Sequence, residues 1–185
     1  MGNMAMLGDL HLHQNRLTDP IPSSLGNLKE LEVLYLDHNY LTSTLPSELG
    51  QCESLEELYL QSNRLTGSLP VDGLWDLGDT LVDLHLDSNA FVGTIPPGIA
   101  RLSELEGLYL NNNGFTGGLP EGLANMTNLR AAMLQENNLN AIVTEGVCSL
   151  RDTQGGELEV LQADCETEGM DGRPKVNCSC CTDCF

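Results

Sequence analysis

A pattern of leucines, one asparagine and one proline recurs at an almost constant interval along the chain. Written L-x-x-L-x-L-x-x-N-x-L/F-x-x-x-I/L-P, it begins at Leu7, Leu31, Leu55, Leu81 and Leu105. The starts lie 24 residues apart, except that the step from Leu55 to Leu81 takes 26. A decayed copy starts at Leu129 and a half copy at Leu158. Self-similarity at a fixed period of this length indicates a solenoid, in which each copy stacks on its neighbours.

Each repeat is expected to contribute one short strand and one helical turn. Leu34 and Leu36 alternate with outward residues, which is the period-two pattern of a half-buried strand. Pro22 fixes φ and removes a backbone donor, which suits the entry into a short turn over residues 22–28. The sequence therefore predicts an α/β solenoid, with a parallel sheet on one face and helical turns on the other.

The ninth position of the repeat is asparagine in six copies: Asn15, Asn39, Asn63, Asn89, Asn113 and Asn137. An amide both donates and accepts hydrogen bonds, so it can satisfy backbone groups where the chain leaves the strand. We interpret these asparagines as a structural ladder and not as a site.

Two positions depart from the repeat. Cys52 stands where the preceding repeat has Leu28, which predicts a buried, inert thiol. The two extra residues near Trp75 predict a bulge at the convex edge.

The repeat that starts at Leu105 reads LEGLYLNNNGFTGGLP and resembles the plant-type extracellular leucine-rich repeat. The resemblance covers nearly all of residues 1–140. It implies a curved solenoid with its sheet on the concave face, an extra strand before each proline, and an extracellular location. Related proteins of this type are receptor-kinase ectodomains, receptor-like proteins and polygalacturonase-inhibiting proteins. No kinase motif and no run of about 18 apolar residues occurs, so only the ectodomain resemblance applies and no transmembrane segment is expected in this chain.

The chain divides into about six repeats over residues 1–147 and a cysteine-rich C-terminal cap over residues 148–185, which includes a seventh strand from Leu158. Residues 1–7 match residues 25–31, so the sequence starts in the middle of a repeat. We expect an N-terminally truncated chain. The alternative is a short protein that tolerates a frayed first coil.

Six of the seven cysteines fall in the cap: Cys148, Cys165, Cys178, Cys180, Cys181 and Cys184. Three disulfides are the simplest explanation and predict an oxidising compartment, although the connectivity stays open. The alternative is a metal site, but structural zinc sites pair two separated C-x-x-C knuckles, which are absent here. The tail also resembles the cysteine-rich caps of secreted algal leucine-rich-repeat proteins. The sequon at Asn125 predicts a glycan on the convex side.

The charge of the chain limits its partners. There are 27 acidic and 8 basic residues, which gives a net charge of -19. Such a protein is repelled by phosphate backbones and by anionic lipid surfaces, so neither nucleic acid nor a membrane surface is expected to bind it. A basic protein or peptide fits this charge.

Five positions of each repeat face outward from the strands. The central column holds His11, Tyr35, Tyr59, His85, Tyr109 and Met133. Aromatic rings flanked by carboxylates suit a peptide- or protein-binding surface, because rigid rings give contact area and charge selects the partner. The candidate ligand-binding residues are Tyr35, Glu57, Tyr59, Asp83, His85, Asp87 and Tyr109. The alternative is a strand face that is only solvated.

Other chemistry finds little support in the sequence. Asp83, His85 and Asp87 share one side of a strand, but alternate residues lie about 6.6 Å apart, so a metal would need further ligands and none is expected to bind. The four histidines have no evident nucleophile partner, and no P-loop, H-E-x-x-H or G-x-S-x-G motif occurs. We therefore expect a protein that is not an enzyme and needs no cofactor.

The favoured function is an extracellular or cell-surface module that recognises a protein or peptide along its concave face. One alternative is an inhibitor of a secreted cell-wall-degrading enzyme. The other is a structural or adhesion protein whose acidic face gathers cations.

Overall fold

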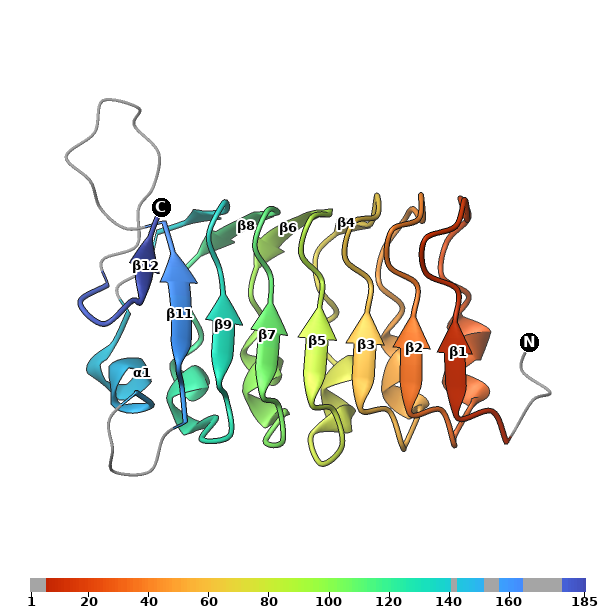
Figure 1. Ribbon diagram of the computed structural model, residues 1–185, viewed down its shortest axis with the longest axis horizontal. Helices are drawn as coiled ribbons and strands as arrows, with labels where there is room; N and C mark the ends of the chain where they lie inside the picture. Colours follow the sequence, from red (N-terminus) through yellow and green to blue (C-terminus); the bar gives the residue numbers. More distant parts are fainter. Residues whose placement is uncertain (1–5, 141–142, 152–156, 165–177) are drawn as a thin grey trace.

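The computed structural model describes residues 6–140, 143–151, 157–164 and 178–185, which form one elongated stack of coils (Figure 1). Each coil adds one short strand to a parallel sheet with the order β1-β2-β3-β5-β7-β9-β11-β12. Its strands are β1 (Asp9–His11), β2 (Val33–Tyr35), β3 (Glu57–Tyr59), β5 (Asp83–His85), β7 (Gly107–Tyr109), β9 (Ala131–Met133), β11 (Val160–Ala163) and β12 (Asp183–Cys184). Because the spatial order follows the chain order, each repeat contacts the repeats next to it in sequence.

The register of this sheet sets equivalent residues of successive repeats side by side. In the pairing of β2 with β3, Leu34 lies beside Leu58 and Tyr35 lies beside Tyr59. In the next pairing, of β3 with β5, Tyr59 lies beside His85. The middle residue of β2, β3, β5, β7 and β9 therefore points into the core, and the residues on either side of it point outward. This middle residue is a leucine in each of these strands except β9, where it is Ala132.

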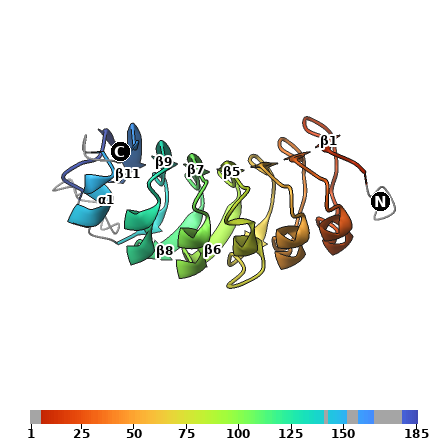
Figure 2. The ribbon, with the colours of Figure 1, turned by 90° about the horizontal axis from the view of Figure 1, so that it is seen from below.

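Short helices form the opposite layer of the stack. Five are 3-10 helices: η1 (Ser23–Asn27), η2 (Ser47–Gln51), η3 (Leu74–Leu77), η4 (Pro97–Arg101) and η5 (Glu121–Asn125). The α-helix α1 (Glu145–Ser149) follows them. Figure 2 shows the helices on the convex side and the first sheet on the concave side of a curved stack. The predicted α/β solenoid is confirmed.

A second parallel sheet joins the two layers along the edge that precedes each proline. Its order is β10-β8-β6-β4. The strands are β4 (Thr66–Gly67), β6 (Ala90–Thr94), β8 (Gly114–Gly117) and β10 (Asn138–Leu139), and β4, β6 and β8 lie behind the first sheet in Figure 1. This sheet is the extra strand region that the resemblance implied.

The core consists of leucine ladders with a few larger side chains. Cys52 is fully buried and carries a free thiol, as predicted, and its Sγ lies 3.3 Å from the carbonyl oxygen of Leu25. Burial raises the pKa of this thiol to about 11, so it stays protonated. Trp75 is also fully buried, and its Nε1 donates a hydrogen bond of 2.7 Å to the carbonyl oxygen of Pro70. The extra residues of the third repeat thus place a large ring inside the stack.

The asparagine ladder has the structural role expected of it. The Asn39 side-chain amide donates to the carbonyl oxygens of Leu12 and Leu36 at 2.9 and 3.0 Å. Its Oδ1 accepts from the backbone N–H of Leu17 at 3.0 Å. From Asn39 onward, each such asparagine satisfies backbone groups of its own coil and of the preceding one, at a net gain of about 1 kcal/mol per bond. Among the described residues, Asn15 donates only to carbonyl oxygens of its own coil.

The C-terminal cap closes the last coil with a helix, two strands and disulfides. The predicted seventh strand is confirmed as β11, which pairs with β9. The sequence did not predict β12, which pairs with the outer edge of β11. Disulfides join Cys148 to Cys180 and Cys178 to Cys181, and Cys184 is also disulfide-bonded.

Three expectations from the sequence are not settled by this fold. Cys165 and residues 1–5, on which the expected truncation rests, lie outside the described residues. The proposed boundary between residues 147 and 148 falls within α1, so the division into repeats and cap stays a proposal.

Candidate functional site

The concave face carries a continuous stack of five aromatic and imidazole rings, which we call the ring column: His11, Tyr35, Tyr59, His85 and Tyr109. Successive ring centroids lie 4.6, 4.4, 4.2 and 3.9 Å apart along the column. The sheet register causes this stacking, because each ring leaves the same position of neighbouring strands. Tyr35 stacks face to face on Tyr59, and His85 on Tyr109, whereas the other two contacts are tilted. Ring edges and polar tips remain for a partner.

Carboxylates lie along one side of the ring column. The Tyr35 hydroxyl donates to the Glu57 carboxylate, and this hydrogen bond is the main reason that the pKa of Tyr35 is raised. Burial raises the pKa of Tyr59 to about 12. Burial also raises the pKa of Asp83, with further contributions from the charges of Glu57 and Glu106. Both phenols are therefore neutral donors at neutral pH.

Asp83 fills the space that a glycine on the next strand leaves free. A Cβ atom at Gly107 would collide with the Asp83 carboxylate oxygen and with the Tyr109 ring. Gly107 is buried beneath these groups. A side chain at this position would therefore displace the Asp83 carboxylate from its place on the concave face.

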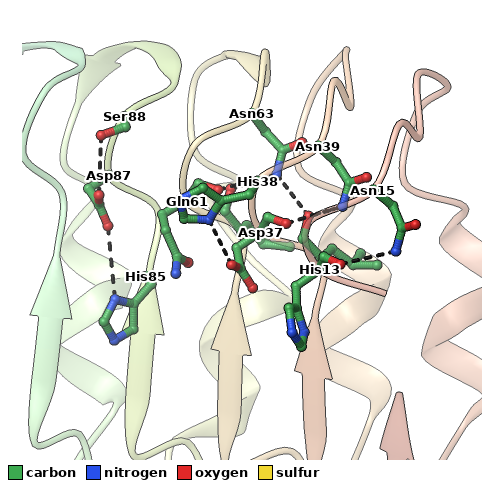
Figure 3. Close-up of polar contacts among 12 residues, drawn as sticks. His13, Asn15, Asp37, His38, Asn39, Gln61, Asn63, His85, Asp87 and Ser88 are labelled. Atoms are coloured by element: carbon green, nitrogen blue, oxygen red, sulfur yellow. Dashed lines mark hydrogen bonds and ion pairs between the residues drawn. The ribbon is translucent and has the colours of Figure 1, made fainter. Parts of the chain in front are cut away.

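Asp87 lies on the other side of the ring column from Asp83, just after β5. The Nδ1 atom of His85 lies 3.9 Å from its Oδ1, and the Ser88 hydroxyl lies 3.3 Å from Oδ2 (Figure 3). Burial between the tyrosine rings lowers the pKa of His85 to about 4, despite the carboxylates of Asp37 and Glu57 nearby. His85 is therefore a neutral imidazole at neutral pH, and its contact with Asp87 is not an ion pair there.

A row of polar side chains runs beside the ring column, one from each repeat. This row, which we call the acceptor row, consists of His13, Asp37, Gln61, Asp87, Asn111 and Gln135. Figure 3 shows its first four members projecting from neighbouring coils. Asp37 is buried and receives a contact of 2.8 Å from Nδ1 of His38.

Four members of the acceptor row have buried atoms with unused hydrogen-bonding capacity. In the described part of the chain, His13 Nδ1, Gln61 Oε1, Asn111 Oδ1 and Gln135 Oε1 have no hydrogen-bond partner within the protein. Buried polar atoms are normally paired, and leaving one unpaired costs about 1–3 kcal/mol. Unpaired polar atoms recur along one line of the concave face. This is the pattern expected of a surface whose hydrogen bonds are completed by a ligand.

All seven predicted site residues lie on this face. Tyr35, Tyr59, His85 and Tyr109 belong to the ring column, Glu57 and Asp83 lie on one side of it, and Asp87 lies in the acceptor row on the other. The prediction did not include His13, Gln61, Asn111 or Gln135. Their signal in the sequence is a polar residue at the seventh position of each repeat, but the unpaired atoms depend on side-chain packing.

The remaining predicted groups lie elsewhere. Asn125 is exposed at the end of η5, on the convex side. Within the described ranges, no cluster of three or more histidine, cysteine, aspartate or glutamate side chains has the arrangement of a metal site. No helix in those ranges has the length and apolar character needed to cross a bilayer.

Comparison with known proteins gives the same fold. A family model described as leucine rich repeat matches residues 6–65, and another of the same description matches residues 104–126. No curated protein matches the chain.

Several solved structures are similar to the chain. The ectodomain of the Arabidopsis thaliana membrane receptor kinase GASSHO1/SCHENGEN3, in complex with CASPARIAN STRIP INTEGRITY FACTOR 2, matches with a TM-score of 0.81 and 32% identity over 90% of this chain and 20% of that chain. The Arabidopsis receptor kinase HAESA, in complex with a peptide hormone and a co-receptor, matches with a TM-score of 0.77 and 34% identity over 88% of this chain and 26% of that chain. A plant ice-binding protein matches with a TM-score of 0.72 and 27% identity over 84% of this chain and 47% of that chain.

This chain spans less than half the length of each of these proteins. The matches to the two receptors nevertheless extend over most of the present sequence, at identities above 30%. The chain has the leucine-rich-repeat solenoid fold, and its likeness to these ectodomains supports a leucine-rich-repeat protein of the plant type.

Proposed function

We propose that the concave face recognises an extended, basic segment of a peptide or protein. The proposal rests on the acceptor row. In this row, Asp37 and Asp87 lie among four side chains that have unpaired buried atoms. A basic segment supplies what this row lacks, because lysine and arginine side chains and backbone N–H groups are donors.

The charge around the row supports a basic partner. Asp83 and Glu57 lie across the ring column from it, and neither forms an ion pair with a basic residue in the described part of the chain. Arg130 is the one basic residue at the outward positions of the concave face. Its guanidinium lies 3.4 Å from Glu106 and 2.7 Å from Glu157, so its charge is already compensated. The face therefore presents uncompensated negative charge to a ligand.

A selection from a library of linear peptides tests this proposal, with the selected peptide as the probe. We expect enrichment of lysine and arginine. We expect the double variant Asp83→Asn/Asp87→Asn to weaken binding of the selected peptide about tenfold or more, since each lost charge pair contributes on the order of 1 kcal/mol.

A matched control separates the site from the total charge. Asp72→Asn/Asp79→Asn removes two exposed carboxylates of the loop around η3, and the net charge changes by the same amount. Equal weakening by both double variants, or enrichment of acidic peptides, would contradict recognition at the concave face.

The proposed location is extracellular or at the cell surface, and the protein is proposed to have no enzymatic activity. The receptor ectodomains that the chain resembles and the disulfides of the cap support this location. Exposure of Asn125 on the convex side is compatible with a glycan that leaves the concave face open.

The two alternatives that the sequence left open, an enzyme inhibitor and an adhesion protein, predict different observations. An enzyme inhibitor would slow a basic cell-wall-degrading enzyme in a direct assay. An adhesion protein would associate when calcium is added, without a saturable partner.

A second candidate function is binding to ice. Its support is the likeness to a plant ice-binding protein, together with the outward face of the second sheet, which is lined by hydroxyl groups and carries little charge. An assay of ice recrystallisation in frozen sucrose solution tests it directly. Crystals that coarsen as fast with this protein as with an unrelated acidic protein would refute it.

A further inference from the structure

The second sheet, together with the coil that precedes it, exposes two rows of small side chains on its outer side. We call this surface the threonine face and define it by Thr42, Thr44, Thr66, Ser68, Val92, Thr94 and Thr116. Three coils contribute two residues each, separated by one residue, so both point to the same side of the chain, and the next coil contributes Thr116 alone because position 118 is glycine. Across the sheet, Thr94 pairs with Thr116 in register. All seven are exposed except Thr42, which is half-buried.

The threonine face differs in charge from the rest of the molecule. The chain has 27 acidic residues, yet the outward positions of this sheet between Tyr40 and Asn138 include no acidic residue. Arg64 is the one charged residue among them, and its guanidinium lies 4.6 Å from the centre of the Tyr40 ring. The face is thus nearly neutral in a strongly anionic protein. Neutrality disfavours the basic partner that the concave face attracts and suits a partner without charge.

Glycines with positive φ allow the rows to lie close together. Gly67, Gly93 and Gly117 have φ values of 78°, 82° and 77°. A Cβ atom at Gly67 would lie 2.8 Å from Cγ2 of Thr44, and one at Gly93 would lie 2.8 Å from Oγ of Ser68. Thr44, Ser68 and Thr94, the second residue of each pair, therefore lie across the glycine of the next coil. Only glycine leaves this space open.

Several side chains of the threonine face are also fixed in orientation. The Thr42 hydroxyl donates to the carbonyl oxygen of Thr18 at 3.2 Å, and the Thr116 hydroxyl donates to that of Gly93 at 3.3 Å. Threonine and valine are stiff at χ1 because they are branched at Cβ. Little conformational entropy would be lost when such side chains meet a rigid surface.

The backbone beneath the threonine face sets its spacing in two directions. Neighbouring strands lie about 4.8 Å apart, and alternate residues along a strand lie about 6.6 Å apart. A hydroxyl can both donate to and accept from water, while the methyl groups between the hydroxyls are apolar. An ice surface is flat, uncharged and periodic, and it offers donors and acceptors at similar spacings. A protein partner would instead require aromatic or charged anchors at the centre of the surface.

We infer that the threonine face is the surface by which this protein adsorbs to ice. The inference rests on the second candidate function and assigns that function to one surface. The concave face, with its charged carboxylates and uneven side chains, takes no part in it.

The experiment places lysine in the middle of the threonine face and measures inhibition of ice recrystallisation. Thr66→Lys and, separately, Thr116→Lys are expected to lose inhibition, since a long charged side chain holds the flat face away from the crystal. Ser24→Lys, in η1, adds the same charge at an exposed position and is expected to retain inhibition. Asp83→Asn/Asp87→Asn is also expected to retain it. Unchanged circular dichroism and thermal unfolding show that each variant is folded. Two lysine variants are used so that the test still stands if one of them does not fold.

The outcomes separate the inference from the function on which it rests. Inhibition by the unaltered protein that is lost in both threonine variants and kept in both controls supports the inference. Inhibition that both folded threonine variants retain overturns the assignment of the surface while ice binding stands. Absence of inhibition in the unaltered protein overturns ice binding and the inference together.

Discussion

His85 is a titratable side chain held inside a stack of rings. Its imidazole packs between Tyr59 and Tyr109, at centroid distances of 4.2 and 3.9 Å. Asp83 lies on the same strand as His85, and Asp87 follows that strand. Glu57 approaches from the neighbouring coil, and Asp37 approaches from the coil beyond it. Burial nevertheless has the largest effect and lowers the pKa of His85 to about 4.

This shift predicts a loss of stability in mild acid. The folded pKa of His85, about 4, lies below its ordinary value of 6.5, so the unfolded chain binds more protons between these two pH values. The free energy of unfolding therefore falls as the pH is lowered through this window. The raised pKa values of Asp83 and Asp87 act in the opposite direction, because the folded carboxyl groups take up protons more readily.

The variant His85→Gln isolates the histidine contribution. We expect its free energy of unfolding to fall less than that of the unaltered protein when the pH is lowered from about 7 to about 4.5. Urea unfolding at the two pH values measures the difference, and the aspartates are present in both proteins. An equal or larger fall in the variant would mean that His85 is not a buried neutral group.

The C-terminal cap is the element that ends the leucine ladders. In α1, the Thr144 hydroxyl accepts the backbone N–H of Val147 at 3.5 Å, and β12 pairs with the edge of β11. The disulfide between Cys148 and Cys180 links this helix to the C-terminal segment, across 32 residues. A covered end matters for a solenoid because an open ladder of leucines exposes apolar surface.

Removal of that disulfide should destabilise the cap. A loop of 32 residues predicts that Cys148→Ser/Cys180→Ser lowers the free energy of unfolding by about 3–4 kcal/mol, through the larger entropy of the unfolded chain. Cys178→Ser/Cys181→Ser opens a bridge between residues only 3 apart and should cost less. Denaturant unfolding of both variants gives the comparison. A greater loss from the short bridge would contradict the loop-length argument.

At the scale of the whole molecule, one solenoid separates two surfaces of different chemistry. The concave face combines stacked rings with carboxylates, and the second sheet presents a nearly neutral array of hydroxyls. The same repeat produces both, because successive positions of each coil leave the backbone in different directions. The net charge of -19 is concentrated away from the threonine face.

This excess of negative charge predicts that salt stabilises the fold. Raising NaCl from about 10 mM to about 150 mM shortens the screening length from about 30 Å to about 8 Å and weakens repulsion among the carboxylates. We expect the thermal midpoint to rise with NaCl, and to rise by the same amount with KCl. A midpoint that is independent of salt would mean that repulsion contributes little to the stability of the stack.

The sequence by itself determined the features that repeat with the leucine period. The parallel sheet, the buried ladder of Asn39 and its equivalents, and the burial of Cys52 could all be predicted, because each depends on one position recurring in every coil. The same period placed Tyr35, Tyr59, His85 and Tyr109 in one column. These features need no knowledge of side-chain conformation, since stacking brings equivalent positions together.

Only the tertiary structure decided the contacts that differ from coil to coil. The Tyr35–Glu57 hydrogen bond, the position of Asp83 above Gly107 and the unpaired atoms of Gln61 and Asn111 depend on rotamers chosen by neighbours in the adjacent repeats. The pairing of Cys148 with Cys180 and the addition of β12 occur where the period has ended, so no pattern could predict them. Local periodicity determines a solenoid, whereas the chemistry of its faces depends on packing between residues of different coils.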